Sequence, residues 1–308
     1  MIATTGPDQL QERPTIPCSE DCLLRPGNTN CGGCGMSVGL TMLDRALDAA
    51  GDSCTLVIPA CCGIVTAGAF PTTSYGVPTI ATTFASAPAV ASGVATVRDL
   101  NDEPGQVICW TGDGGTYDIG LGTLSAAAER NENIIYVCYD NEIYGNTGGQ
   151  RSSATPAGAR TTTTPWGKTE GKKDIMSIMA GHHVPYAATL SIAHPDDFAH
   201  KMSVALSMQG MRFLLLHSPC PTGWKSEPEN SVALVRMAVA SGLFPLYEVY
   251  DGASYRVNVE PDGTDPEEYF RLQRRFGDEE IDLDTTRRAC SDRMQRLQAL
   301  AKQYPPDK

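Results

Sequence analysis

Two groups of oxygen-bearing residues follow two apolar runs in the middle of the chain. Asp113 follows QVICWTG and is flanked by Gly112 and Gly114, whereas Asn141 follows NIIYVCYD. The interval between Asp113 and Asn141 has room for one helix and one strand, so both side chains are expected at the carboxyl edge of a parallel sheet. Mg²⁺ prefers a few protein oxygens together with phosphate oxygens. The spacing therefore predicts a diphosphate-bound Mg²⁺ held by Asp113, Asn141 and the Ile143 carbonyl.

The residues around these two ligands are suited to a diphosphate cofactor. Glycines let the backbone approach phosphate closely, and the segment after Gly115 leads into a helix whose first amides can hold phosphate oxygens. We therefore expect thiamine diphosphate and carbanion chemistry on a carbonyl substrate; two ordinary turns rich in Gly and Asn are the alternative. The candidate cofactor-binding residues are Gly112, Asp113, Gly114, Gly115, Tyr117, Asp118, Ile119, Asn141, Ile143, Tyr144, Asn146, Thr147 and Gly148.

Asn146 is the candidate catalytic residue, because an amide placed next to the diphosphate can hydrogen-bond substrate or cofactor. Its alternative role is that of a turn-forming asparagine.

Eleven cysteines are many for a chain without a secretory signal. In a cytosolic setting, cysteines are more often metal ligands or free thiols than disulfides. The sequence Cys31-Gly-Gly-Cys34-Gly places two thiolates within reach of one metal centre. Four thiolates would hold a [4Fe–4S] cluster, and zinc is the alternative, although no second CxxC or His pair follows. Cys18 and Cys22 form a CxxxC to which we assign no role.

The run from Tyr139 to Gln150, YDNEIYGNTGGQ, resembles the thiamine-binding β subunit of 2-oxoacid:ferredoxin oxidoreductases, above all the pyruvate enzyme (pyruvate synthase). The resemblance continues through RSSATP (151–156), PCPTGW (219–224) and FPLYE (244–248). It therefore covers nearly the whole chain from Cys31 to the segment after residue 243.

The resemblance implies a complete ligand set for the cluster. Cys62 and Cys220 are its remaining two cysteines, with Cys61 as an adjacent alternative to Cys62. It also implies oxidative decarboxylation of a 2-oxoacid, with pyruvate and coenzyme A giving acetyl-CoA and CO2. Electrons would leave through the cluster to ferredoxin.

Partner chains are implied as well. The sequence has no ferredoxin-type cysteine run and no evident carboxylate to activate the thiamine ring. We expect both on α-, γ- and δ-type subunits of the same enzyme. The loop 151–173 is a candidate contact for coenzyme A or a neighbouring subunit, and a solvated loop is the alternative.

One departure from the family keeps the substrate open. The family carries an acidic residue shortly after the third cluster cysteine, whereas this chain has Cys62-Gly63-Ile64-Val65. Alternatives to pyruvate are 2-oxoglutarate, branched-chain or aryl 2-oxoacids, and oxalate, which would need no coenzyme A. A non-redox thiamine decarboxylase or synthase would leave the four cysteines without purpose. A non-catalytic iron–sulfur scaffold would leave Asp113 and Asn141 without purpose.

Composition excludes other classes of function. The net charge of −12 over 308 residues argues against binding of a nucleic-acid backbone. No apolar run approaches the roughly 18 residues typical of a membrane span, and the N-terminus lacks the basic and apolar regions of a secretory signal. We therefore expect a cytoplasmic protein that binds neither nucleic acid nor membranes.

Apolar runs alternate with helical patterns from Cys31 onward, which predicts an α/β fold with a parallel sheet covered by helices on both faces. We expect a thiamine diphosphate-binding fold with arms at both ends. The predicted organisation is an N-terminal arm (1–30), a cofactor- and cluster-binding domain (31–243), and a C-terminal hairpin and helical tail (244–308) that packs on partner subunits.

Overall fold

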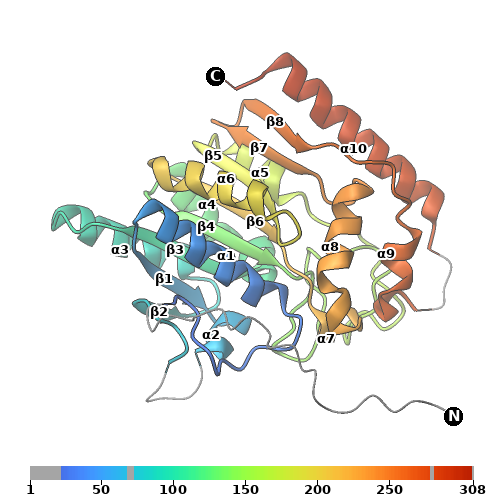
Figure 1. The fold of residues 1–308 in the computed structure, drawn as a ribbon, viewed down its shortest axis with the longest axis horizontal. Helices are drawn as coiled ribbons and strands as arrows, with labels where there is room; N and C mark the ends of the chain where they lie inside the picture. The colour runs from blue at the N-terminus through green and yellow to red at the C-terminus, as the bar shows by residue number, and fades with distance from the viewer. Residues whose placement is uncertain (1–21, 68–72, 278–280, 307–308) are drawn as a thin grey trace, which may run out of the picture.

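The computed structural model describes residues 22–67, 73–277 and 281–306. They form one eight-stranded sheet in the order β2-β1-β3-β4-β6-β5-β7-β8 (Figure 1). The strands are β1 (Cys54–Pro59), β2 (Thr79–Thr82), β3 (Gln106–Gly112), β4 (Ile135–Asp140), β5 (Tyr186–Ser191), β6 (Arg212–His217), β7 (Leu246–Tyr250) and β8 (Ser254–Val259). The first six strands in this order pair in parallel.

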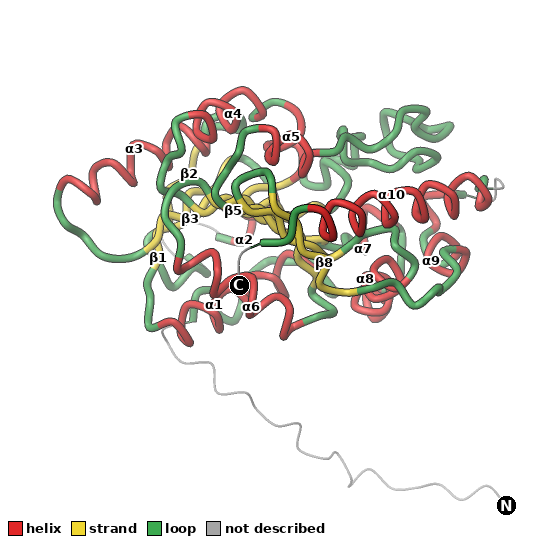
Figure 2. The backbone as a smooth tube through the Cα atoms, turned by 90° about the horizontal axis from the view of Figure 1, so that it is seen from above, coloured by secondary structure: helices red, strands yellow, loops and turns green. Residues whose placement is uncertain are grey.

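Helices cover both faces of the sheet, as the alternating pattern predicted. They are α1 (Gly35–Ala50), α2 (Cys62–Thr66), α3 (Ala87–Leu100), α4 (Leu121–Glu129), α5 (Ile175–Gly181), α6 (Pro195–Ser207), α7 (Pro221–Trp224), α8 (Ser231–Ala240), α9 (Glu267–Arg271) and α10 (Leu283–Gln303). Helices α1 and α6 lie on one face and α3, α4 and α5 on the other (Figure 2). Every residue of β1, β4, β5 and β6 is buried, which explains their uninterrupted apolar character.

The C-terminal hairpin extends the sheet instead of standing apart from it. Strand β7 pairs antiparallel with β5, and β8 pairs antiparallel with β7. Helix α10 then runs back along β8 (Figure 1). No structural boundary therefore lies at residue 243, because the sheet continues across it. Packing of this region on partner subunits stays a prediction.

The described end of the predicted N-terminal arm packs on its own chain. Leu23 is fully buried, its amide donates to Asp44 Oδ1 (2.9 Å), and Leu24 forms an antiparallel bridge with Tyr75. Residues 1–21, including Cys18, lie outside the described residues. Within the described ranges, no helix combines the length and apolarity needed to cross a membrane.

Candidate cofactor and cluster site

The carboxyl ends of four adjacent parallel strands carry the predicted site residues. In the order β1-β3-β4-β6, these ends lead into Cys62, Asp113, Asn141 and Cys220. Parallel strands that are neighbours in a sheet end at the same edge. The sheet therefore brings together residues that are up to 158 positions apart in the chain.

Asp113, Asn141 and Ile143 converge as the predicted cation ligands should. One terminal atom of the Asn141 amide lies 2.8 Å from the Ile143 carbonyl oxygen and 3.1 Å from Asp113 Oδ1. If this atom is nitrogen, it donates to both oxygens. If it is oxygen, three acceptors face one another, which is favourable only around a cation. The donor set therefore fits a divalent cation.

Asp113 is a buried carboxylate that forms no ion pair with any described residue. It is 2% exposed, and among the described residues no ion pair neutralises it. Burial, and then the nearby Asp140 carboxylate, raise its pKa well above the usual value. The Ser152 hydroxyl donates to Asp113 Oδ2 (2.5 Å) and orients it. A bound cation would remove this electrostatic cost.

The glycine-rich segment after Asp113 forms a π-helical turn, Gly114–Asp118, and not the start of the following α-helix. Such turns are often found at functional sites. Tyr144 packs directly on this turn, since a Cβ at Gly114 would lie 2.2 Å from Tyr144 Cε1. The Tyr144 hydroxyl also donates to Asp118 Oδ2 (2.5 Å). Only glycine at position 114 allows the two halves of the predicted cofactor loop to meet.

The remaining predicted cofactor residues differ in placement. Gly112 lies against the Tyr139 ring and Gly115 against Phe84. The side chain of Ile119 is 58% exposed, so only its backbone remains available to a ligand on the inner side of the turn. Asn146, Thr147 and Gly148 form an exposed turn after Tyr144, with the amide of Gly148 bonded to the Gly145 carbonyl (3.3 Å).

Tyr117 is hydrogen-bonded to Asp140 and not to Asp113. Its buried hydroxyl donates to Asp140 Oδ2 (2.7 Å), so the structure does not bring its side chain to the predicted cation ligands. Asp140 belongs to a buried ion network in which Lys172 Nζ lies 2.6 Å from Asp140 and 2.9 Å from Glu142. Arg275 completes it, 2.6 Å from Glu142 Oε2.

No pattern in the sequence predicts this network, because its cations come from the polar loop and the C-terminal region. Burial alone would raise the pKa of Glu142, but Lys172 and Arg275 hold it at about 2. Glu142 also has a positive φ of 63°, unusual for a residue other than glycine. The two ion pairs thus stabilise a strained backbone directly between the predicted ligands Asn141 and Ile143.

A second feature of this edge is a cavity of about 870 Å³ that we call the thiol cavity. All four cysteines proposed for the cluster, Cys31, Cys34, Cys62 and Cys220, line it. The cofactor loop forms another wall, because Asn141, Ile143, Gly145 and Asn146 line the same cavity. The structure therefore brings the four thiols and the predicted cofactor loop together.

Two close approaches hold the CGGCG turn in place. A Cβ at Gly35 would lie 2.3 Å from Pro219 Cδ, and a Cβ at Gly33 would lie 2.5 Å from the Pro228 carbonyl oxygen. The Gly35 amide donates to the Pro219 carbonyl (3.0 Å). Glycine is thus required where this turn meets the loop that carries Cys220.

Two hydrogen bonds fix the Cys62 side of the cavity. The Thr66 hydroxyl on α2 donates to Asn30 Oδ1 (2.5 Å), and the Thr29 hydroxyl donates to the Val65 carbonyl (2.6 Å). They join the segment before Cys31 to the helix that begins at Cys62.

Cys61 and Cys62 face different surroundings. Cys62 lines the thiol cavity, whereas Cys61 does not. The Tyr139 hydroxyl accepts from the Gly63 amide (3.2 Å) and is hydrogen-bonded to the Cys61 thiol. Burial raises the pKa of both thiols, that of Cys62 to about 12. The geometry favours Cys62 over Cys61 as the residue that faces a bound group.

Comparisons with known proteins agree with this arrangement. Residues 60–217 match the family model "Thiamine pyrophosphate enzyme, C-terminal TPP binding domain". The chain is 45% identical to the pyruvate synthase subunit PorB of Methanothermobacter marburgensis, over 83% of this chain and 90% of that protein. It is 42% identical to the ketoisovalerate oxidoreductase subunit VorB of Pyrococcus horikoshii, over 88% and 89%.

The fold also matches a solved structure, the 2-oxoglutarate:ferredoxin oxidoreductase from Magnetococcus marinus. The TM-score is 0.62 at 22% identity, over 88% of this chain and 95% of that one. This match supports the fold, and the two relatives above, which are similar over most of their length, establish the family. The chain belongs to the thiamine diphosphate-binding β subunits of the 2-oxoacid:ferredoxin oxidoreductases.

Proposed function

We propose that this chain catalyses oxidative decarboxylation of pyruvate as the β subunit of a multi-subunit enzyme. The C1–C2 bond of pyruvate breaks to release CO2, and a thioester forms with coenzyme A. Two electrons leave singly for two ferredoxins, and one proton is released. The observation that supports the proposal is that the four thiols and the cofactor loop line the same cavity.

Thiamine diphosphate, when bound, would supply the carbanion and the electron sink of the reaction. Asp113, Asn141 and the Ile143 carbonyl would hold its Mg²⁺, since the Asn141 amide lies within 3.1 Å of both other groups. Ser152 would orient Asp113 through its short hydrogen bond. Asn146, on the exposed turn of the cofactor loop, stays our candidate for contact with the substrate.

Cys31, Cys34, Cys62 and Cys220 would hold a [4Fe–4S] cluster. Among the described residues, no three His, Cys, Asp or Glu side chains are close enough to hold a single metal ion. Thiols spread around a cavity of about 870 Å³ suit a cluster of several atoms better than one zinc ion. A Cβ at Gly145 would lie 3.7 Å from Cys62 Sγ and 3.8 Å from Cys220 Sγ, so the cofactor loop reaches the thiols themselves.

Pyruvate is favoured by the resemblance of the cofactor loop, and a branched-chain 2-oxoacid is its closest rival. The relatives include both a pyruvate synthase subunit and a ketoisovalerate oxidoreductase subunit at similar identity. Coenzyme A, ferredoxin and α-, γ- and δ-type subunits belong to the same proposal. A partner chain would supply the carboxylate at the thiamine ring and the groups that hold the substrate carboxylate.

The substrate test uses the complex purified anaerobically with its native partner chains. Viologen reduction is followed with pyruvate, 2-oxoglutarate, 2-oxoisovalerate and oxalate, each with and without coenzyme A. We expect strong reduction with pyruvate only when coenzyme A is present. Stronger reduction with 2-oxoisovalerate would change the substrate, and oxalate oxidation without coenzyme A would indicate the variant reaction. No reduction in a complex that holds iron and thiamine would refute the function.

The cluster test compares two adjacent cysteines. In the Cys62→Ser complex we expect loss of this cluster's electron paramagnetic resonance signal and of the corresponding iron. The Cys61→Ser complex should retain both, because Cys61 faces Tyr139. Retention of the signal in Cys62→Ser together with its loss in Cys61→Ser would reverse the ligand assignment.

A further inference from the structure

A second cavity lies beneath α10, on the other side of the buried ion network. Its volume is about 310 Å³, at the lower end of the range for small-molecule sites. Residues from α5, β5, β6, α8, β7, α9 and α10 line it. Because neither the cation ligands Asn141 and Ile143 nor any of the four cluster thiols lines it, this α10 cavity is distinct from the proposed catalytic site.

The floor of the α10 cavity contains a polar side chain without a partner. His217, the last residue of β6, is 2% exposed, and neither of its ring nitrogens has a hydrogen-bond partner. Its ring stacks on Phe244, with the centroids 4.6 Å apart. Burial lowers the pKa of His217 to about 3, so the ring is neutral at physiological pH and offers one donor and one acceptor. A buried polar group of this kind normally has a partner.

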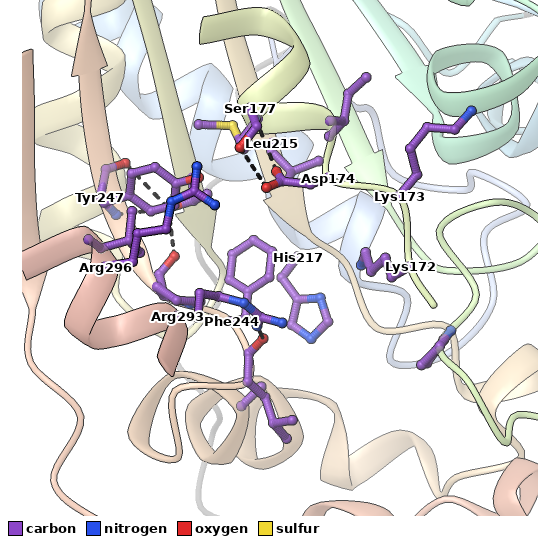
Figure 3. Close-up of a pocket in the computed structure, with 18 of the residues that line it drawn as sticks. Lys172, Lys173, Asp174, Ser177, Leu215, His217, Phe244, Tyr247, Arg293 and Arg296 are labelled. Atoms are coloured by element: carbon purple, nitrogen blue, oxygen red, sulfur yellow. Dashed lines mark hydrogen bonds between the residues drawn. The ribbon is translucent and has the colours of Figure 1, made fainter. Parts of the chain in front are cut away.

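The mouth of the cavity is predominantly cationic, although the carboxylates Asp174 and Glu142 also line the cavity. Arg293 and Arg296 reach it from α10, and Lys172 and Lys173 line the opposite side (Figure 3). Lys172 is engaged by Asp140 and Glu142, and Arg293 donates to the Leu243 carbonyl (2.9 Å). Within the described part of the chain, no hydrogen bond or ion pair engages the Arg296 guanidinium.

Between mouth and floor the lining is largely apolar and aromatic. Leu215, Phe244 and Phe270 contribute side chains there, and Tyr247 places its half-buried ring near the two arginines. Figure 3 shows the His217 and Phe244 rings in the space between α10 and the loop that carries Lys172. From α10 inward, the lining therefore consists of two arginines, an apolar wall and a neutral hydrogen-bonding ring.

We propose that the α10 cavity binds a small amphipathic carboxylate. Its carboxylate would pair with Arg296 and Arg293, its apolar body would lie against Phe244 and Leu215, and a distal polar atom would hydrogen-bond His217. A single aromatic ring fits the limited volume. This site is independent of the proposed reaction, since none of the groups that would take part in catalysis contacts the ligand.

The test uses 4-hydroxyphenylacetate as probe and calorimetric titration of the complete complex with its partner chains. Tyrosol lacks the carboxylate and phenylacetate lacks the distal hydroxyl, so the three compounds separate the two ends of the site. We expect saturable binding of 4-hydroxyphenylacetate and affinity about tenfold or more lower for tyrosol, since a charge-assisted pair is lost. Phenylacetate should bind more weakly than the hydroxylated probe.

Arg296→Gln is the deciding variant, because within the described residues it breaks no hydrogen bond or ion pair of the folded chain. It should weaken the probe about tenfold or more. Arg288→Gln, on the same helix but outside the cavity lining, is the matched control and should leave the affinity unchanged. Absence of binding, or binding that pyruvate displaces and Arg296→Gln leaves unchanged, would overturn the proposal.

Discussion

The two sides of the segment from Asp140 to Ile143 differ in whether cations of the chain neutralise the buried carboxylates. Asp140 and Glu142 point to a side where Lys172 and Arg275 neutralise them. The Asn141 amide instead contacts Asp113, a buried carboxylate that forms no ion pair within the described chain and that Lys172 influences only from a distance. Burial of a charge is tolerable only when an opposite charge compensates it. This difference is expected if the charges beside Glu142 are structural and if Asp113 holds the cation that we propose.

Glu142→Gln tests the structural side and has the largest expected effect. It leaves Arg275, 2% exposed, without its carboxylate, and loss of one partner of a buried pair costs about 3–5 kcal/mol. Denaturant unfolding of the cofactor-free chain measures this loss. Glu268→Gln, which breaks the exposed pair with Arg271, is the control and should change stability little. Equal effects of the two variants would contradict the distinction.

Asp113→Asn tests the ligand side. Removal of a direct cation ligand should weaken Mg²⁺–thiamine diphosphate binding by more than about 100-fold, since loss of outer-shell partners alone costs about 10–100-fold. The cofactor-free chain should at the same time become more stable, because a buried carboxylate without a cation opposes folding. Calorimetric titration and thermal unfolding provide the two readouts, with exposed Asp99→Asn as control. Loss of stability in Asp113→Asn would contradict the proposed distinction between structural and ligand-binding carboxylates.

Ser152→Ala also tests the side that contains Asp113, and its expected effect on cofactor affinity is smaller. It removes the hydroxyl that donates to Asp113 Oδ2 while leaving the three proposed cation ligands in place. We expect cofactor affinity to fall by about tenfold. Ser153→Ala is the matched control on the neighbouring residue, which bonds Asp118 instead. A larger loss in Ser153→Ala than in Ser152→Ala would show that Asp118, not Asp113, orients the cofactor.

Glu142 and Asp113 should also change the stability of the folded chain with pH in opposite directions. This is the smallest of the expected effects. The pKa of Glu142 in the folded chain, about 2, lies below its ordinary value of 4.5, so its contribution to stability is present above pH 4.5 and is lost as pH falls toward 2. Asp113 has a raised folded pKa, so its ionisation opposes folding as pH rises above its unfolded value of 3.8. Thermal unfolding of the cofactor-free chain against pH should therefore be less acid-sensitive in Glu142→Gln. In Asp113→Asn, stability should decline less as pH rises; unchanged curves in both variants would exclude these assignments.

Sequence reasoning predicted the sheet and its functional edge because both depend on local patterns. Apolar runs mark the strands, and a residue such as Asp113 that follows a strand must lie at its carboxyl end. The sequence alone does not decide whether Cys61 or Cys62 lines the thiol cavity, because the two residues are adjacent. Only the orientation of α2 separates them. Only Cys62 lines the cavity, a difference that the spacing of residues along the chain cannot show.

The ion network could not be predicted in this way. Lys172 lies in a polar loop without periodicity, and Arg275 is 133 positions from Glu142. Pairing over such distances depends on tertiary packing, which leaves no repeat in the sequence. Ser152 gave a weaker signal, since it directly follows the recognised cofactor run, but nothing in RSSATP distinguishes the serine that bonds Asp113 from its neighbour.

The two borders of the sheet also determine how this protein can associate. The free side of β8 is closed by the chain itself, since the Tyr255 amide donates to the Tyr304 carbonyl (2.8 Å) at the end of α10. The opposite border, β2, is only four residues long. Short or covered borders oppose strand addition by a second molecule and so limit fibre formation. Neighbouring subunits are therefore expected to dock through helices and loops, and a truncation before Tyr304 would expose a strand that favours aggregation.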